Sequence, residues 1–154
     1  MATVHKISGD FYENSFALMA LHTSMEDYAL AYAINLTLNS KLKRTKEDLG
    51  ISQDISFSIF EWKDVVNYRD FTLISNNSVK KDNKEQEGLF QFEPSFTRYH
   101  LIPEHKEVDY LLKIENDMEA DEEEILESIL SIPKIITAYV LNTENLKSKK
   151  NLIF

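Results

Sequence analysis

The stretch LIPEHKEVDYLLKI, residues 101–114, decides how the rest of the chain is arranged. It follows a run of aromatic and branched residues that is typical of a strand. Pro103 lacks an N–H group and fixes φ, so it ends that strand and keeps Ile102 extended. Residues 104–107 then make a polar turn. From Val108 onward every second residue is apolar, which predicts another strand with one well-buried face.

A connection this short predicts that the two strands pair as an antiparallel hairpin with the turn at its tip. On this interpretation Val108 and Tyr110 share the face that enters the core, and the Tyr110 hydroxyl reaches a polar partner at the rim. Asp109 lies on the opposite face, where its carboxylate would accept hydrogen bonds from the N–H groups of residues 104–106. Glu104 is expected to be a solvated turn residue.

The string I-P-E-x-x-x-V-D-Y is complete in this stretch, and its defined positions are Ile102, Pro103, Glu104, Val108, Asp109 and Tyr110. In these residues the chain resembles the bacterial IPExxxVDY family, which is named for that string. Members have a similar length, so the resemblance extends over the whole chain. It implies a small soluble bacterial protein with no established activity or cofactor, in which the six signature residues have either a structural or a binding role.

Composition limits the classes of protein to which the chain could belong. Its 154 residues are enough for one domain with a buried core, and 43% of them are hydrophobic, which is too apolar for a disordered chain. Cysteine is absent, which excludes disulfides, thiolate metal sites and a cysteine nucleophile. The first residues lack the pattern of a signal peptide, and no apolar run approaches the length that spans a membrane. We therefore expect a cytoplasmic protein.

The net charge of −9 disfavours sequence-independent binding to nucleic acid, because that binding depends on Lys and Arg side chains that neutralise phosphates. Two short basic runs, at residues 41–46 and 147–150, are the candidates for a local basic patch. Solvated helix ends explain both runs more simply, since cations suit helix C-termini.

Apolar spacing predicts the secondary-structure elements. Strands are expected at residues 16–22, 55–62, 70–75, 96–102, 108–114 and 135–141, with further extended pieces near Val4, Ile7, Phe90 and Phe92. Helices are expected at residues 25–40, capped by Thr23 or Ser24, and from residue 117 to Pro133. Residues 76–88 are expected to form an exposed loop. Residues 142–154 form a C-terminal tail, whose last residues Leu152, Ile153 and Phe154 should pack on the domain or on a neighbour.

This order predicts a single α+β domain, residues 1–154, in which two helices pack on one mainly antiparallel sheet. A ferredoxin-like core with extra strands fits it. The first helix has one apolar stripe that suits the sheet and a second stripe, formed by Tyr28, Tyr32 and Leu36. The second stripe should contact a loop, another helix or a partner chain.

The residues suited to catalysis form no complete motif. Glu104, Glu107 and Asp109 could serve as paired carboxylates for acid–base work, but no nucleophile or oxyanion donor accompanies them. His100 and His105 could join them at a metal, yet their spacing across a proline turn gives the two imidazoles no common direction. The glycines stand alone, so a phosphate loop is missing. We therefore predict no cofactor and no metal site.

The sequence favours a non-catalytic protein-interaction or regulatory module, whose partner is another protein or a second copy of the chain. Dimerisation is predicted from the second apolar stripe of the first helix and from the need of several strands for edge protection. The alternatives are a small-ligand-binding domain and, less favoured, an enzyme that uses the carboxylates of the signature turn.

Overall fold

The computed structural model describes residues 16–52, 55–81, 96–116 and 122–154. The extended pieces expected near Val4, Ile7, Phe90 and Phe92 lie outside these residues. No helix within the described ranges is long and apolar enough to cross a membrane.

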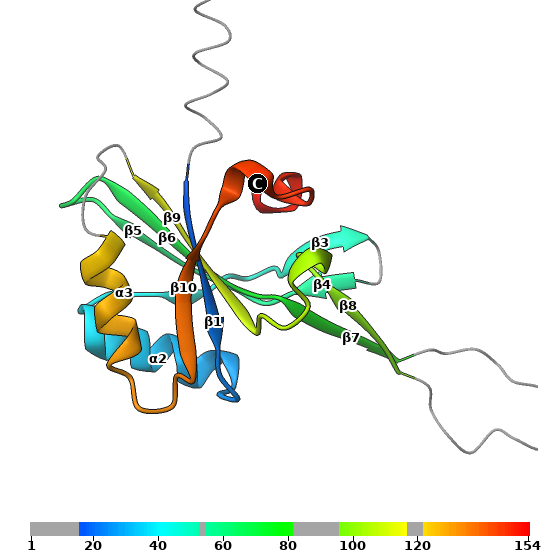
Figure 1. Cartoon of the computed structure of the whole chain (residues 1–154), viewed down its shortest axis with the longest axis horizontal. Coiled ribbons are helices and arrows are strands. Elements are labelled where there is room, and N and C mark those ends of the chain that lie inside the picture. Colours follow the sequence, from blue (N-terminus) through cyan, green and yellow to red (C-terminus); the bar gives the residue numbers. More distant parts are fainter. Residues whose placement is uncertain (1–15, 53–54, 82–95, 117–121) are drawn as a thin grey trace, which may run out of the picture.

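The chain folds into a mainly antiparallel sheet on which two helices pack, as the sequence predicts (Figure 1). The main sheet has six strands in the order β10-β1-β9-β6-β5-β2, and each strand runs antiparallel to its neighbours. Its strands are β1 (Ala17–His22), β2 (Lys43–Arg44), β5 (Ile59–Asp64), β6 (Arg69–Ser75), β9 (Tyr110–Asn116) and β10 (Thr137–Leu141). The helices are α2 (Asp27–Leu38) and α3 (Glu122–Leu130).

Four of these strands, in the order β10-β1-β9-β6, have the arrangement of a ferredoxin-like fold. Helix α2 follows the first of them in the chain, and α3 connects β9 to β10. Strands β5 and β2 extend the sheet on one side. Two small hairpins stand apart from it, one formed by β3 (Leu49–Ser52) and β4 (Ile55–Phe57), the other by β7 (Asn77–Lys81) and β8 (Phe96–His100). The β7–β8 ribbon projects away from the helices (Figure 1).

One face of the sheet carries both helices. Helix α2 buries Leu30, Ala31 and Ile34 there, and α3 buries Ile125 and Ile129. The spacing of these residues follows the helical period, as expected for helices that pack on a sheet. Leu130, also expected in the buried stripe of the second helix, is instead 44% exposed. The predicted caps of the first helix are wrong, since its N-cap is Glu26, which makes no side-chain hydrogen bond.

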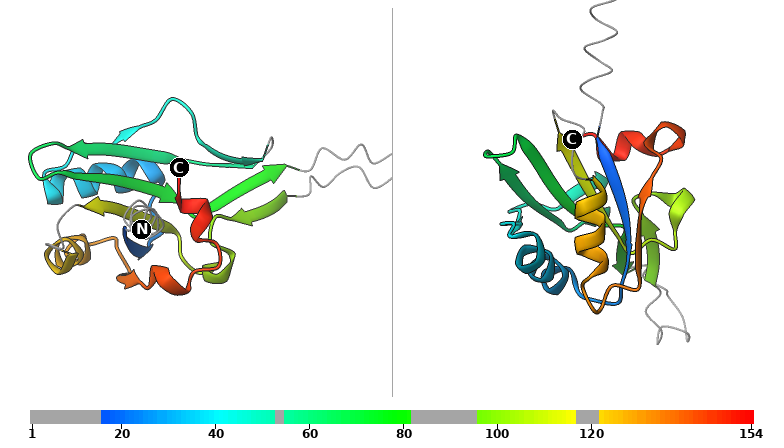
Figure 2. Two further views of the ribbon diagram at one scale, coloured as in Figure 1. Left: turned by 90° about the horizontal axis from the view of Figure 1, so that it is seen from above. Right: turned by 60° about the vertical axis from the view of Figure 1, so that its left-hand side comes forward.

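The other face of the sheet is covered by the signature turn and the C-terminal tail. Leu101, Ile102 and Val108 of the turn pack there against β1, β6 and β9. Leu146 and Leu152 of the tail join them, and the tail lies on the side of the sheet away from α2 (Figure 2). The prediction that the tail packs on the domain is confirmed for Leu152, which is fully buried, whereas Ile153 and Phe154 are about half exposed.

The predicted hairpin at the signature is wrong. Strand β8 pairs with β7, and β9 pairs with β1 and β6. The regular strand begins only at Tyr110, after the short 3-10 helix η1 (Pro103–His105). Val108 therefore does not follow the alternation, and it packs on the face of the sheet opposite to Tyr110.

Two other boundaries differ from the prediction. The strand expected at residues 55–62 is divided at Ser58 into β4 and β5, which pair with different strands. The loop expected at residues 76–88 is wrong in its first part, since Asn76 is fully buried and is followed by β7, which pairs with β8. The partners of Asn76 and of β7 both come much later in the chain, so the local pattern does not show them. The basic run at residues 41–46 is likewise no helix end, since it contains β2.

Candidate functional site

The signature turn is built around the side chain of Asn76, which directly follows β6. Its Nδ2 donates hydrogen bonds to the carbonyl oxygens of His105 and Val108, both at 2.9 Å. Its Oδ1 accepts the N–H of Ile102 at 2.8 Å. The main chain of Asn76 adds bonds to Leu101 N–H and Asp109 O. Among the twenty side chains only an amide offers both two donors and an acceptor here, so Asn76 fixes the turn in a way that an acid could not.

Asp109 connects the signature to the start of the first helix. Its Oδ2 accepts the N–H of Thr23 at 2.9 Å, and its own N–H donates to Leu21 O at 3.1 Å. The Thr23 hydroxyl then donates to Lys134 O at 2.8 Å. The prediction that Asp109 binds N–H groups of residues 104–106 is wrong, because the approach to β9 lies beside the end of β1 rather than beside β8.

Tyr110 has the position and the partner that the sequence predicts. Its ring packs against the cluster beneath the helices, and its hydroxyl donates to Met25 O at 2.7 Å. Burial, followed by the nearby acidic groups Asp27 and Glu26, raises the pKa of Tyr110 to about 12. The phenol is therefore protonated near neutral pH, where it remains a donor.

Glu104 is not a solvated turn residue, although it was expected to be one. Its two carboxylate oxygens accept the N–H and the hydroxyl of Ser148, at 3.0 and 2.9 Å. Burial would raise the pKa of Glu104, but the hydrogen bonds from Ser148 outweigh it and hold the pKa below its usual value. Nearby, Asn151 Nδ2 donates to Leu101 O at 2.9 Å. The signature turn thus holds the C-terminal tail in place.

The three signature-turn carboxylates do not converge on one point. Glu104 binds Ser148, Asp109 binds Thr23, and Glu107 lies 3.4 Å from His105 Nδ1. In the ranges that the structure describes, no group of three His, Asp or Glu side chains could hold a metal ion.

The two histidines of this region, His100 and His105, have different surroundings. His105 is half-buried in the turn beside Glu107, whereas His100 ends β8 opposite Asn77. Burial, followed by the charges of Lys106 and Arg98, lowers the pKa of His100.

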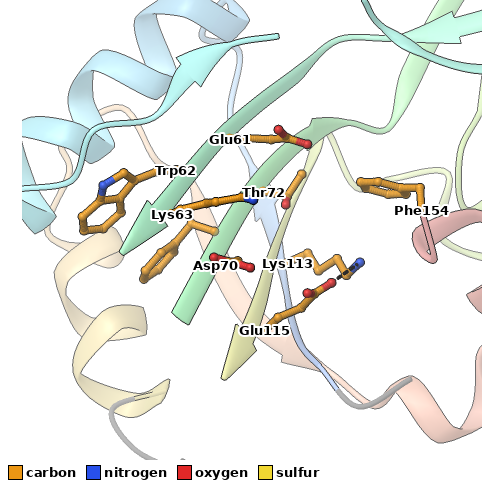
Figure 3. Close-up of a pocket in the computed structure, with 9 residues that line it drawn as sticks. Glu61, Trp62, Lys63, Asp70, Thr72, Lys113, Glu115 and Phe154 are labelled. Carbon is orange, nitrogen blue, oxygen red and sulfur yellow. Dashed lines mark ion pairs between the residues drawn. The ribbon is translucent and has the colours of Figure 1, made fainter. Parts of the chain in front are cut away.

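A charged groove of about 280 Å³ lies over β5, β6 and β9, on the face that the tail only partly covers (Figure 3). Strand alternation places its polar lining residues on one face, and Figure 3 shows Trp62 pointing to the other side of the strands. Phe154, the last residue of the C-terminal tail, lines one end of the groove. The polar lining residues are Glu61, Lys63, Asp70, Thr72, Lys113 and Glu115.

Lys113 is the buried charged residue of this groove, with only 3% of its side chain exposed. Its Nζ donates to Leu152 O at 2.6 Å and pairs with Glu115 Oε1 at 2.7 Å. The ammonium also lies 4.5 Å from the centre of the Phe154 ring and 5.0 Å from that of Phe16. These contacts satisfy the cation and fasten the tail to the sheet. The alternation of β9 indicates a polar face for Lys113, but nothing in the sequence predicts that the tail covers it.

The second stripe of α2 is exposed. Tyr28, Tyr32 and Leu36 are 68%, 65% and 68% exposed, and their four-residue spacing places them on one face of the helix. At the start of this helix Asp27 pairs with Arg44 of β2, whose NH1 lies 3.2 Å from Asp27 Oδ2.

The fold and these surfaces define a small α+β protein with a ferredoxin-like core. The side chains of its signature turn make structural hydrogen bonds, whereas the charged groove and the α2 stripe are open to solvent. Comparison of the chain with protein-family profiles, with curated proteins and with solved structures finds no match.

Proposed function

We propose that this protein is a non-catalytic protein-interaction module that binds a partner protein through the α2 stripe. The observation that carries the proposal is the exposure of Tyr28, Tyr32 and Leu36 on a single helix face. Tyrosine is enriched at protein interfaces, because its ring contributes apolar area and its hydroxyl can still find a partner. The other stripe of the same helix is buried, so α2 is held firmly while it presents these side chains.

The chemistry of the signature turn supports a binding module over an enzyme. A catalytic carboxylate needs a free oxygen that can reach a substrate. Both oxygens of Glu104 accept hydrogen bonds from Ser148, and Oδ2 of Asp109 accepts one from Thr23. These bonds join parts of the chain that are distant in sequence, as expected for structural residues. Glu107 is exposed, but its polar neighbour in the turn is His105.

Affinity capture from the native cell, followed by mass spectrometry, tests the proposal. The parent chain is compared with Tyr32→Glu, which places a charge in the stripe, and with the control Val66→Glu, in the β5–β6 turn, where Val66 is 85% exposed. We expect a protein that is retained by the parent and the control and lost by Tyr32→Glu. Equal retention by all three chains, each with an unchanged melting temperature, would contradict the proposal.

The charged groove supports a second candidate, the binding of a small polar ligand. Its floor presents Lys63 beside acidic groups, and its rim presents the ring of Phe154, which suits a compact ligand with both charges. Ligand addition should then raise the melting temperature of the parent but not of Thr72→Arg, which fills the groove. An equal shift in both chains would exclude the groove.

We also propose that the chain is a bacterial, cytoplasmic member of the IPExxxVDY family. All six signature positions are present, and each has a definite role in the fold, since Ile102 and Val108 are buried and Pro103 opens the helix η1. On this proposal, other chains that carry the string should also carry an amide side chain at the place of Asn76. A set of such chains with apolar residues there would contradict it.

A further inference from the structure

The outer edge of β10 differs from the other edge of the main sheet. Only the β1 side of β10 is paired among the described strands, so the opposite side presents backbone N–H and C=O groups. At the far edge, β2 has two residues, both charged, which protects it from pairing. Strand β10 has five residues, TAYVL, none of them charged. Ile136 and Val140 beside this edge are 77% and 44% exposed.

We propose that β10 pairs antiparallel with β10 of a second copy of this chain, so that the two six-stranded sheets join across a two-fold axis. This proposal rests on the proposed function as an interaction module, and it assigns self-association to a surface other than the α2 stripe. Antiparallel pairing of identical edges is self-complementary, because each contact occurs twice. The backbone groups of the edge supply hydrogen bonds in regular register, which is the usual basis of strand addition.

The charges beyond the two ends of β10 favour a second copy as the occupant. Lys134 precedes the strand and Glu144 follows it, equally far in sequence from Tyr139, and both are exposed. A two-fold axis at Tyr139 brings Lys134 of each copy to the end of the strand where Glu144 of the other copy lies. Opposite charges then lie at the same end of the joined strands, whereas a parallel arrangement would place like charges at each end.

The β10 edge and the α2 stripe are separable surfaces. Asp27 at the start of α2 pairs with Arg44 of β2, which is the strand at the opposite edge of the sheet. A substitution at β10 therefore leaves the α2 stripe intact, and the converse also holds.

Sedimentation equilibrium tests the proposal. We expect the parent chain at about 100 μM to have twice its 17.9 kDa mass. The double variant Ile136→Lys/Val140→Lys should sediment as a monomer, because it places four added positive charges at the joined edges. Tyr32→Lys, in the α2 stripe, should remain a dimer. A monomeric parent, or a dimer that Tyr32→Lys dissociates and the double variant does not, would overturn the β10 proposal. The second of these results would leave the α2 stripe as a binding surface.

Cross-linking decides the register without relying on the double variant. Because the chain has no cysteine, a single introduced thiol reports only its own surroundings. Tyr139→Cys should form a disulfide-linked dimer on mild oxidation, since the axis places residue 139 opposite itself at strand-pair distance. Val66→Cys is the exposed control and should link much more slowly. Equal rates for the two, or no link at residue 139, would refute pairing at this register.

Discussion

Replacing Asn76 by alanine should unfold the signature turn from its centre. The side chain is fully buried, and its loss leaves the N–H of Ile102 and the carbonyl of Val108 without partners in a buried site. Each buried group left unpaired costs about 1–3 kcal/mol. His105 O adds less, because that residue is half-buried and water can reach it. The expected loss is therefore roughly 2–6 kcal/mol, a large share of the ~5–15 kcal/mol that stabilises a typical domain.

Urea unfolding measures this loss, with the fluorescence of the single tryptophan, Trp62, and circular dichroism as independent probes. The control is Asn145→Ala, an exposed asparagine in the 3-10 helix η2 (Thr143–Asn145), for which a change within about 0.5 kcal/mol is expected. A loss below about 1 kcal/mol for Asn76→Ala would refute the reasoning, because the turn would then have another source of order.

Three further changes test individual contacts. Tyr110→Phe removes the bond to Met25 O and should cost about 1–2 kcal/mol in the same unfolding assay, whereas Tyr28→Phe, on an exposed ring, should cost almost nothing. Lys113→Met should loosen the tail, so that trypsin cuts after Lys147 faster than in the parent, while Lys63→Met in the same groove should leave the cutting rate unchanged. Burial would raise the pKa of Asp64, but hydrogen bonds from Asn67 and Arg69 lower it below its usual value of 3.8. The stability that Asp64 contributes is therefore complete above that value and is lost as the pH falls through its lower folded-state pKa, so Asp64→Asn should destabilise the protein at about pH 7 and much less at about pH 2. An equal loss at both pH values would contradict this assignment.

Local pattern was enough to predict most of the elements. The apolar run at residues 16–22 and the helical spacing of Leu30 and Ile34 depend only on nearby residues, and β1 and α2 form where they were expected. The antiparallel sheet with two helices follows from the order of these elements. The Tyr110 hydroxyl also found its expected kind of partner, because a ring placed in the core at the end of a strand has its polar tip near free carbonyls.

The wrong predictions concern residues whose partners in the fold are distant in sequence. A hairpin was the simplest pairing for β8 and β9, but β9 instead fits between β1 and β6, where both of its faces are buried. Asn76 stands at the start of a polar stretch and looks like a loop residue. Its structural role depends on the carbonyl groups of His105 and Val108, which the signature turn brings together some 30 residues later. Lys113 is similar, since only the folded tail explains why a cation is buried there.

The residues that build the fold of this protein differ from those that we propose for binding. The helices cover one face of the sheet, and the signature turn with the tail covers much of the other, so the signature completes a core that is buried on both sides. Its residues are engaged with one another and with Thr23 and Ser148, whereas apolar side chains are exposed on the α2 stripe, beside the β10 edge and in the β5–β6 turn. It follows that changes in the signature should reduce stability and binding together, whereas changes at Tyr32 or Val140 should reduce binding at constant stability. A signature substitution such as Glu104→Gln that abolished binding without altering the free energy of unfolding would reverse this assignment, and it would make the turn itself the binding site.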